Sequence, residues 1–235
     1  MSRWKMSSLA IITARGGSKR IPRKNIKDFL GKPIIAYSIE AALQSGVFDE
    51  VMVSTDDEEI AEIAKKYGAK VPFMRSAATS NDFATTADVL LEVLSKYKEA
   101  NVVFDYGCCI YPTAPFITAE KLRNSMNTLV NSDSSALVPV VKFSFPPQRG
   151  LVIRAGNLGF LHPENATVRS QDLEPIYHDC GQFYMFSCAD FEREKAVFMK
   201  KTIPFIVPET EVQDIDDEND WIIAEEKYKR IIGSR

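Results

Sequence analysis

Short apolar runs of strand length alternate with segments of helical periodicity from the N-terminus to Val141 of this 235-residue chain. This alternation is typical of successive strand–helix units, in which helices cover both faces of a mainly parallel sheet. The sequence therefore predicts an α/β fold of the doubly wound class. A chain of this length closes about one hydrophobic core, so we expect a single domain over residues 1–235.

The bounds of each element follow from apolar spacing and from the residues that end a helix. Pro33 suits the first helical turn, Gly46 and Gly68 suit helix ends, and Asp56 or Asp57 can cap the helix that follows. We expect strands at 9–13, 50–55, 70–73, 102–112, 135–141, 181–187 and 202–208, and helices at 33–46, 58–68, 86–99, 118–130 and 217–233.

The alternation of strands and helices ends after Val141, where Pro and Gly recur without a helical period. The segment 151–161 predicts a β-hairpin with its turn at Ala155 to Asn157, as part of an excursion from the sheet over residues 143–175. Long excursions inside a compact domain are usually functional or form an interface.

Charge and hydropathy exclude several classes of protein. A net charge of −3 gives no general attraction to nucleic acid, and no apolar run reaches the roughly 18 residues of a membrane span. The opening residues lack the core of a signal peptide, so we expect a cytoplasmic protein. The four cysteines and two histidines show no zinc-binding spacing.

A basic, glycine-containing loop follows the first predicted strand in the segment TARGGSKRIPRKN, residues 13–25. The carboxyl ends of strands are where open α/β sheets bind ligands. Glycines allow close backbone approach, and five cations within ten residues can neutralise a triphosphate. The alternative is a basic loop that is merely solvated, but the position of the loop directly after a strand favours phosphate binding. Nucleic-acid binding is disfavoured because no aromatic residues alternate with the cations.

Two aspartates, Asp214 and Asp216, flank Ile215 near the C-terminal end. In an extended segment their carboxylates point to one side and Ile215 to the other. Such a pair can bind Mg²⁺ together with phosphate oxygens. The alternative is capping of the next helix, which Asp216 or Asp217 can supply alone; the residues leave both interpretations open.

The basic loop resembles a motif of the acylneuraminate cytidylyltransferases, the CMP-sialic acid synthetases. The resemblance extends through GKPIIAYSIEAA (31–42), VSTDDEEIAEIAKKYGA (53–69), YPTAP (111–115) and the acidic segment. It implies a nucleotidyltransferase that uses CTP, with Mg²⁺ on Asp214 and Asp216. It assigns catalysis to Arg15, Lys19, Lys24, Asp214 and Asp216, and nucleotide binding to Ala14, Arg15, Gly16, Gly17, Ser18, Lys19, Lys24, Asn25, Arg75 and Thr86.

The segments KFSFPPQR (142–149), RSQDL (169–173) and YHDCGQFY (177–184) look like the branch of that family that activates pseudaminic acid, an acidic nine-carbon sugar. Tyr111 stands where many sialic acid enzymes have Gln. CMP-N-acetylneuraminic or CMP-legionaminic acid synthesis is the alternative. The candidates for the sugar site are Tyr111, Thr113, Lys142, Arg149, Arg169, Gln171, His178, Gln182 and Tyr184.

The implied reaction is attack of the sugar's anomeric hydroxyl on the α-phosphorus of CTP, with pyrophosphate as the leaving group. The resemblance also implies a homodimer in which the 143–175 excursion packs on its partner. A non-catalytic nucleotide-binding regulator is the alternative from another class, although such a protein has no need of both Asp214 and Asp216.

Overall fold

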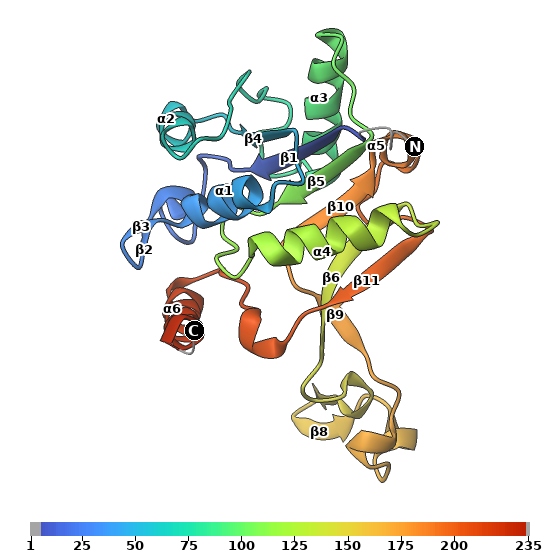
Figure 1. Cartoon of the computed structure of the whole chain (residues 1–235). Coiled ribbons are helices and arrows are strands. Elements are labelled where there is room, and N and C mark those ends of the chain that lie inside the picture. The colour runs from blue at the N-terminus through green and yellow to red at the C-terminus, as the bar shows by residue number, and fades with distance from the viewer. Residues whose placement is uncertain (1–5, 234–235) are drawn as a thin grey trace.

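The computed structural model describes residues 6–233 and shows one twisted sheet with helices on both faces (Figure 1). The strand order is β11-β6-β10-β5-β1-β4, with β9 paired to β6. Strands β1, β4 and β5 run parallel, as do β6 and β11, whereas β10 is antiparallel to both β5 and β6. The strands of this sheet are β1 (Ser8–Thr13), β4 (Glu50–Ser54), β5 (Tyr106–Ile110), β6 (Ala136–Lys142), β9 (Tyr177–Asp179), β10 (Phe183–Ser187) and β11 (Thr202–Ile206).

Alternate residues of each strand feed two separate hydrophobic layers. In β1, Ala10 and Ile12 face a core shared with α1, α2 and α4, whereas Leu9 and Ile11 face one shared with α3 and α5. Period-2 alternation is what a sheet covered on both faces requires. The helices are α1 (Ile34–Ser45), α2 (Glu58–Lys66), α3 (Thr86–Glu99), α4 (Ala119–Val130), α5 (Cys188–Glu194) and α6 (Glu218–Gly233).

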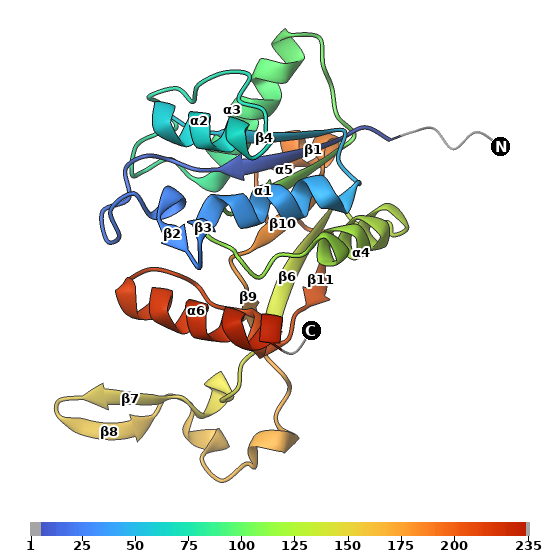
Figure 2. The same ribbon diagram turned by 60° about the vertical axis from the view of Figure 1, so that its left-hand side comes forward.

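The C-terminal helix α6 lies beside the start of α1 rather than on the sheet (Figures 1 and 2). Trp221 of α6 packs with Ile21 of the basic loop and with Ile215, in a third apolar cluster. This cluster fixes the basic loop and the acidic segment next to each other, although they lie almost 200 residues apart in the chain.

The sequence predictions for fold and elements are largely confirmed. The expected doubly wound α/β arrangement is present, Asp57 caps α2 through the Ile60 N–H, and Gly46 ends α1 in the left-handed region. The predicted strand at 70–73 is wrong: Lys70 forms one isolated bridge with Met52. The sequence did not predict α5, β9 or the small hairpin of β2 (Asp28–Phe29) and β3 (Lys32–Pro33). It also did not predict the short 3₁₀ helices, which are Lys24–Ile26, Pro147–Arg149, Pro163–Asn165, Ser170–Asp172 and Glu209–Glu211.

The excursion between β6 and β9 projects from the body of the protein (Figures 1 and 2). Its hairpin comprises β7 (Leu151–Arg154) and β8 (Asn157–Phe160), as predicted. Ala155 and Gly156 both have positive φ, 49° and 81°, which matches the twist of a two-residue hairpin turn.

No helix in the part of the chain that the structure describes has the length and apolar character to cross a membrane. Residues 1–5 and 234–235 lie outside the described residues, and with them the expectation about a signal peptide and the two ends of the predicted domain. The treatment of residues 1–235 as one domain stays a prediction.

Candidate active site

A polar cleft lies at the carboxyl ends of β1, β4 and β5. Its larger cavity, about 410 Å³, is lined by the basic loop and by the segment after β5. A smaller cavity of about 210 Å³ lies against the start of α3. Thr13 and Arg15 line both cavities, so the two adjoin. Another cavity, about 390 Å³, opens near the other end of the sheet around Phe104 and Cys188, away from these residues.

The glycine turn of the basic loop is held by acidic residues that follow β4. The Gly16 N–H donates to Asp56 Oδ1 at 2.9 Å. A side chain at Gly16 would place its Cβ 2.7 Å from Asp57 Oδ2, whereas a Cβ at Gly17 meets nothing within 4 Å. Because Arg23 donates to Asp57 from both terminal nitrogens of its guanidinium group, Asp57 has little room to move.

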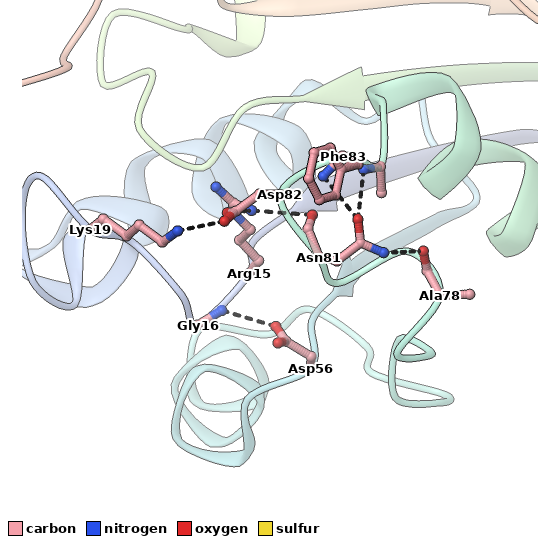
Figure 3. Close-up of polar contacts among 9 residues, drawn as sticks. Arg15, Gly16, Lys19, Asp56, Ala78, Asn81, Asp82 and Phe83 are labelled. Atoms are coloured by element: carbon pink, nitrogen blue, oxygen red, sulfur yellow. Dashed lines mark hydrogen bonds and ion pairs between the residues drawn. The ribbon is translucent and has the colours of Figure 1, made fainter.

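Two of the predicted phosphate-binding cations share one carboxylate, that of Asp82 (Figure 3). Arg15 donates to Asp82 Oδ1 at 2.9 Å, and Lys19 donates to Asp82 Oδ2 at 2.5 Å. Asn81 holds the same segment by accepting from the N–H groups of Phe83 and Ala84. An anionic ligand would therefore compete with Asp82 for Arg15 and Lys19.

The third predicted cation, Lys24, lies beside the two aspartates. Its ammonium donates to the carbonyl of Ile215 at 2.7 Å, between Asp214 and Asp216. Burial lowers the pKa of Lys24, against the attraction of the two carboxylates. Desolvation, followed by the charge of Asp216, raises the pKa of Asp214. Arg20 forms an ion pair with Asp216 at 2.7 Å.

Helix capping near the acidic pair is the task of a different residue. Asp217 Oδ1 accepts from the N–H groups of Asn219 and Asp220, at 2.8 and 3.0 Å. Ile215 is 1% exposed, and the aspartates beside it therefore face away from the apolar cluster. Asp217 therefore caps α6, and neither Asp214 nor Asp216 is needed for that role.

The smaller cavity contains the residues predicted to read the base. Arg75 is buried, and two of its N–H groups are used by Ser54: Nε donates to Oγ at 3.0 Å and the terminal nitrogen to the carbonyl at 2.6 Å. The other donors of its guanidinium stay available to a ligand. Thr86 lies at the start of α3, with its hydroxyl 3.3 Å from that of Tyr111.

The remaining predicted nucleotide-binding residues lie around the loop. Ser18 and Asn25 line the larger cavity, and Asn25 also braces the loop by donating to the carbonyl of Arg15 at 2.8 Å. Ala14 is fully buried, and its N–H donates to Ser54 of β4. Its contribution is therefore to fix where the loop begins.

The sugar-site candidates fall into separate groups. Tyr111 and Thr113 line the larger cavity, and Tyr184 lies buried behind Tyr111. Gln182 is buried, and its amide nitrogen donates to the carbonyl of Glu211. It thereby supports the segment that leads to Asp214.

The other candidates lie at the excursion and line neither cavity of the cleft. Lys142 and His178 are exposed on the paired ends of β6 and β9, and the His178 ring packs on Phe143. Arg149 donates to Ser170, which neighbours Gln171, and Arg169 pairs with Asp172. Within one chain, therefore, none of these five residues contributes to the cleft.

Most of the chain matches a known protein family. The profile of a family described as cytidylyltransferase matches residues 9–201. The chain belongs to the cytidylyltransferase family. It is therefore a nucleotidyltransferase, and the resemblance noted in the sequence is confirmed.

This cytidylyltransferase is similar to two named proteins and to one solved structure. It is 43% identical to a pseudaminic acid cytidylyltransferase of Campylobacter jejuni, over 95% of this chain and 97% of that protein. A CMP-N,N'-diacetyllegionaminic acid synthase of Legionella pneumophila is 35% identical, over 94% and 95% of the two chains. A CMP:2-keto-3-deoxy-manno-octonic acid synthetase structure shares the fold, with a TM-score of 0.69 at 19% identity, covering 96% and 99% of the two chains.

Proposed function

We propose that this cytidylyltransferase joins CTP to pseudaminic acid, giving the CMP-sugar and pyrophosphate. The observation that carries the proposal is the cleft itself. A cation-lined cavity of about 410 Å³ adjoins a smaller one that contains a buried arginine, which suits the phosphates and the base of one nucleotide. The relatives at 42–43% identity support the choice of sugar.

Each part of the cleft would have a defined task. Arg15, Lys19 and Lys24 would hold the triphosphate and stabilise the charge that develops on the departing pyrophosphate. Arg75 would donate to the acceptor atoms of cytosine, with Thr86 beside it. The sugar's anomeric hydroxyl would attack the α-phosphorus in line with the leaving group, so positioning supplies much of the rate enhancement.

Magnesium would bind at Asp214 and Asp216. Burial and the neighbouring charge of Asp216 raise the pKa of Asp214, and a lysine lies beside the pair. Such a pair fits a cation that is bound partly by phosphate oxygens. When bound, Mg²⁺ supplies positive charge that offsets the charge of the transferred phosphate. Asp216 would exchange its ion pair with Arg20 for the metal.

The sugar would lie in the larger cavity, against Tyr111 and Thr113. Because Lys142, Arg149, Arg169, Gln171 and His178 lie outside that cavity, we propose that they reach the cleft of a second chain in a homodimer. The exposed apolar residues of the excursion support this arrangement, among them Ile153 and Leu158. We also propose a cytoplasmic location, where CTP is available.

The test is pyrophosphate release with Mg²⁺ and each of CTP, UTP, GTP and ATP, crossed with pseudaminic, legionaminic and N-acetylneuraminic acids. The proposal expects release with CTP and pseudaminic acid above all other pairs. Release with CTP and a different acid would keep the reaction and overturn the sugar. CTP binding without release in the presence of any of the three acids would overturn the proposed reaction.

Two variants make the assay specific. Asp214→Ala and Asp216→Ala should abolish release, because the metal would lose its protein ligands. Asp133→Ala, at an exposed position in the turn after α4, is the matched control and should keep full activity. The assay without Mg²⁺ should resemble the two site variants.

A further inference from the structure

Arg75, the residue proposed to contact the base, belongs to no helix or strand. Its N–H donates to the carbonyl of Thr55 at 2.8 Å, and its guanidinium donates to Ser54. Regular secondary structure therefore does not fix the backbone around Arg75. The place of its side chain in the smaller cavity depends on what holds the residues beside it.

An ion pair of α3 holds the residues on both sides of Arg75. Glu92 and Lys96 lie about one helical turn apart, and Lys96 Nζ lies 2.9 Å from Glu92 Oε1. Lys96 donates to the carbonyl of Met74 at 2.9 Å, and Glu92 Oε1 accepts from the N–H of Ser76 at 2.9 Å. This pair, the Glu92–Lys96 clamp, thus binds peptide groups that directly precede and follow Arg75.

The clamp also makes contacts further along the same segment. Glu92 Oε2 accepts from the hydroxyl of Ser76 at 3.0 Å and, in a short hydrogen bond, from the hydroxyl of Thr79. The ammonium of Lys96 lies 4.8 Å from the centroid of the Phe73 ring. The contacts of the clamp therefore extend from Phe73 to Thr79, and Thr79 itself lines the smaller cavity.

Glu92 stays ionised in this environment. Burial would raise its pKa, but hydrogen bonds from Thr79, Lys96 and Ser76 outweigh burial and hold the pKa at about 2. The side chains of Glu92 and Lys96 are 14% and 29% exposed, so water screens them less than a surface pair. Hydrogen bonds to such a carboxylate are stronger than those between neutral groups.

The charge of Glu92 also acts on Arg75. Burial lowers the pKa of Arg75, and the negative charges of Asp56 and Glu92 oppose that effect. A buried cation is costly unless nearby charge or hydrogen bonds compensate for it. Glu92 therefore holds the backbone beside Arg75 and offsets part of the cost of burying the guanidinium.

We propose that Glu92 and Lys96 are positioning residues for Arg75, which hold its guanidinium where the base of a bound nucleotide would lie. Neither residue lines the two cavities of the cleft, so both would act through Arg75. The basic loop has other supports, namely Asp56 and Asn25. The clamp therefore serves the base of the nucleotide rather than its phosphates, and the inference rests on the proposed binding of CTP in this cleft.

The experiment is calorimetric titration of the full chain with CTP and, separately, with inorganic pyrophosphate. Glu92→Ala removes the acceptor of the Ser76 N–H, and Lys96→Met removes the donor to Met74 but keeps an unbranched side chain over Phe73. Each variant should bind CTP at least about tenfold more weakly, because each loses hydrogen bonds of a charged group.

Pyrophosphate separates this role from a general loss of structure. It lacks a base, and the cations proposed to bind it are Arg15, Lys19 and Lys24, none of which contacts the clamp through a hydrogen bond or ion pair that the structure shows among the described residues. Both variants should therefore bind pyrophosphate no more weakly than the wild type. Equal weakening of CTP and pyrophosphate would overturn the inference.

A conservative variant and a double variant test whether the two residues act together. Glu92→Gln can still accept from the Ser76 N–H and can donate to the hydroxyls of Ser76 and Thr79, so it should lose less CTP affinity than Glu92→Ala. Glu92→Ala combined with Lys96→Met should lose less than the product of the two separate losses, since residues of one network are not additive.

The matched controls lie on the same helix. Glu99→Ala and Lys98→Met change exposed residues of α3 that do not contact residues 73–79 through any hydrogen bond or ion pair shown for the described residues, and both should keep the wild-type affinity for CTP. Melting curves of all variants identify any that fail to fold.

The outcomes also distinguish this inference from the proposed function. A wild type that does not bind CTP would contradict the proposed function. A wild type that binds CTP, with the same affinity in folded Glu92→Ala and Lys96→Met, would overturn the inference alone.

Discussion

At the scale of single residues, two neighbouring glycines in the basic loop have different tasks. A methyl group at Gly16 would lie 2.7 Å from Asp57 Oδ2, and Arg23 holds Asp57 in place. Overpacking of this kind costs about 1–3 kcal/mol. Gly16→Ala should therefore weaken CTP binding by about fivefold to a hundredfold, since the loop must move. Gly17→Ala, whose Cβ meets nothing within 4 Å, is the matched control.

CTP affinity measured by titration checks this prediction. Equal affinities of the two alanine variants would show that the loop adapts to either side chain and that the contact with Asp57 does not shape the phosphate site.

Asp82 should compete with the triphosphate. It pairs with both Arg15 and Lys19, and these two hydrogen bonds, Lys19 first, lower the pKa of Asp82. Asp82→Asn removes the negative charge but leaves Asn81 to hold the loop. Because exposed ion pairs are weak, we expect CTP and inorganic pyrophosphate to bind only a few-fold more tightly. Weaker binding of both would show that Asp82 contributes to the bound state instead.

The sequence predicted the cations of this site but not the acidic residue that pairs with two of them. Arg15, Lys19 and Lys24 follow a strand, and a local motif is enough to find them. Asp82 lies 67 residues from Arg15, so only the folded chain brings the two together. A lone carboxylate in a sequence carries no signal of the cations with which it pairs.

At the scale of secondary structure, the start of α6 separates two kinds of aspartate. Asp217 satisfies N–H groups of the first turn, so Asp217→Ala should cost about 1 kcal/mol, a fall in Tm of roughly 2–4 °C. Asp214 instead has a raised pKa in the folded protein. Its ionised form costs folding free energy at neutral pH, where the unfolded chain carries the same charge without the burial and the repulsion.

Asp214→Asn should therefore raise the Tm of the magnesium-free protein at pH 7. The gain should shrink as the pH falls through the raised pKa towards the ordinary value near 3.8, since the folded wild type then takes up a proton and loses the repulsion. Thermal melts across that range, with Asp217→Ala alongside, measure both effects. A gain that grew at low pH would contradict the assignment.

Element type followed from sequence wherever one local period dominated. The helix predicted at 86–99 has the same bounds as α3, because its apolar spacing and the Thr85 cap agree. The segment 70–73 failed because its only sheet contact is a single bridge at the edge strand β4. The antiparallel direction of β10 and the pairing of β9 could not be predicted, since both depend on the path of the excursion.

At the scale of the whole molecule, the excursion is the candidate dimer interface. Leu158, in β8, is 66% exposed. We predict that light scattering gives a dimer for the wild type and a folded monomer for Leu158→Asp, because a buried charge in an apolar interface is costly. The control is Val103→Asp. Val103 is 71% exposed and lies just before the start of β5, outside the excursion. A wild-type monomer at micromolar concentration would contradict the dimer and leave the excursion residues without a cleft to reach.

The reaction itself is tested most directly by following the phosphorus atoms of CTP. With pseudaminic acid and Mg²⁺, label at the α-phosphorus should appear in the sugar product, while label at the γ-phosphorus should appear only in pyrophosphate. That result would establish transfer of the cytidylyl group to the sugar with pyrophosphate as the leaving group. Label from the γ-phosphorus in the sugar, or α-label only in free CMP, would contradict the account.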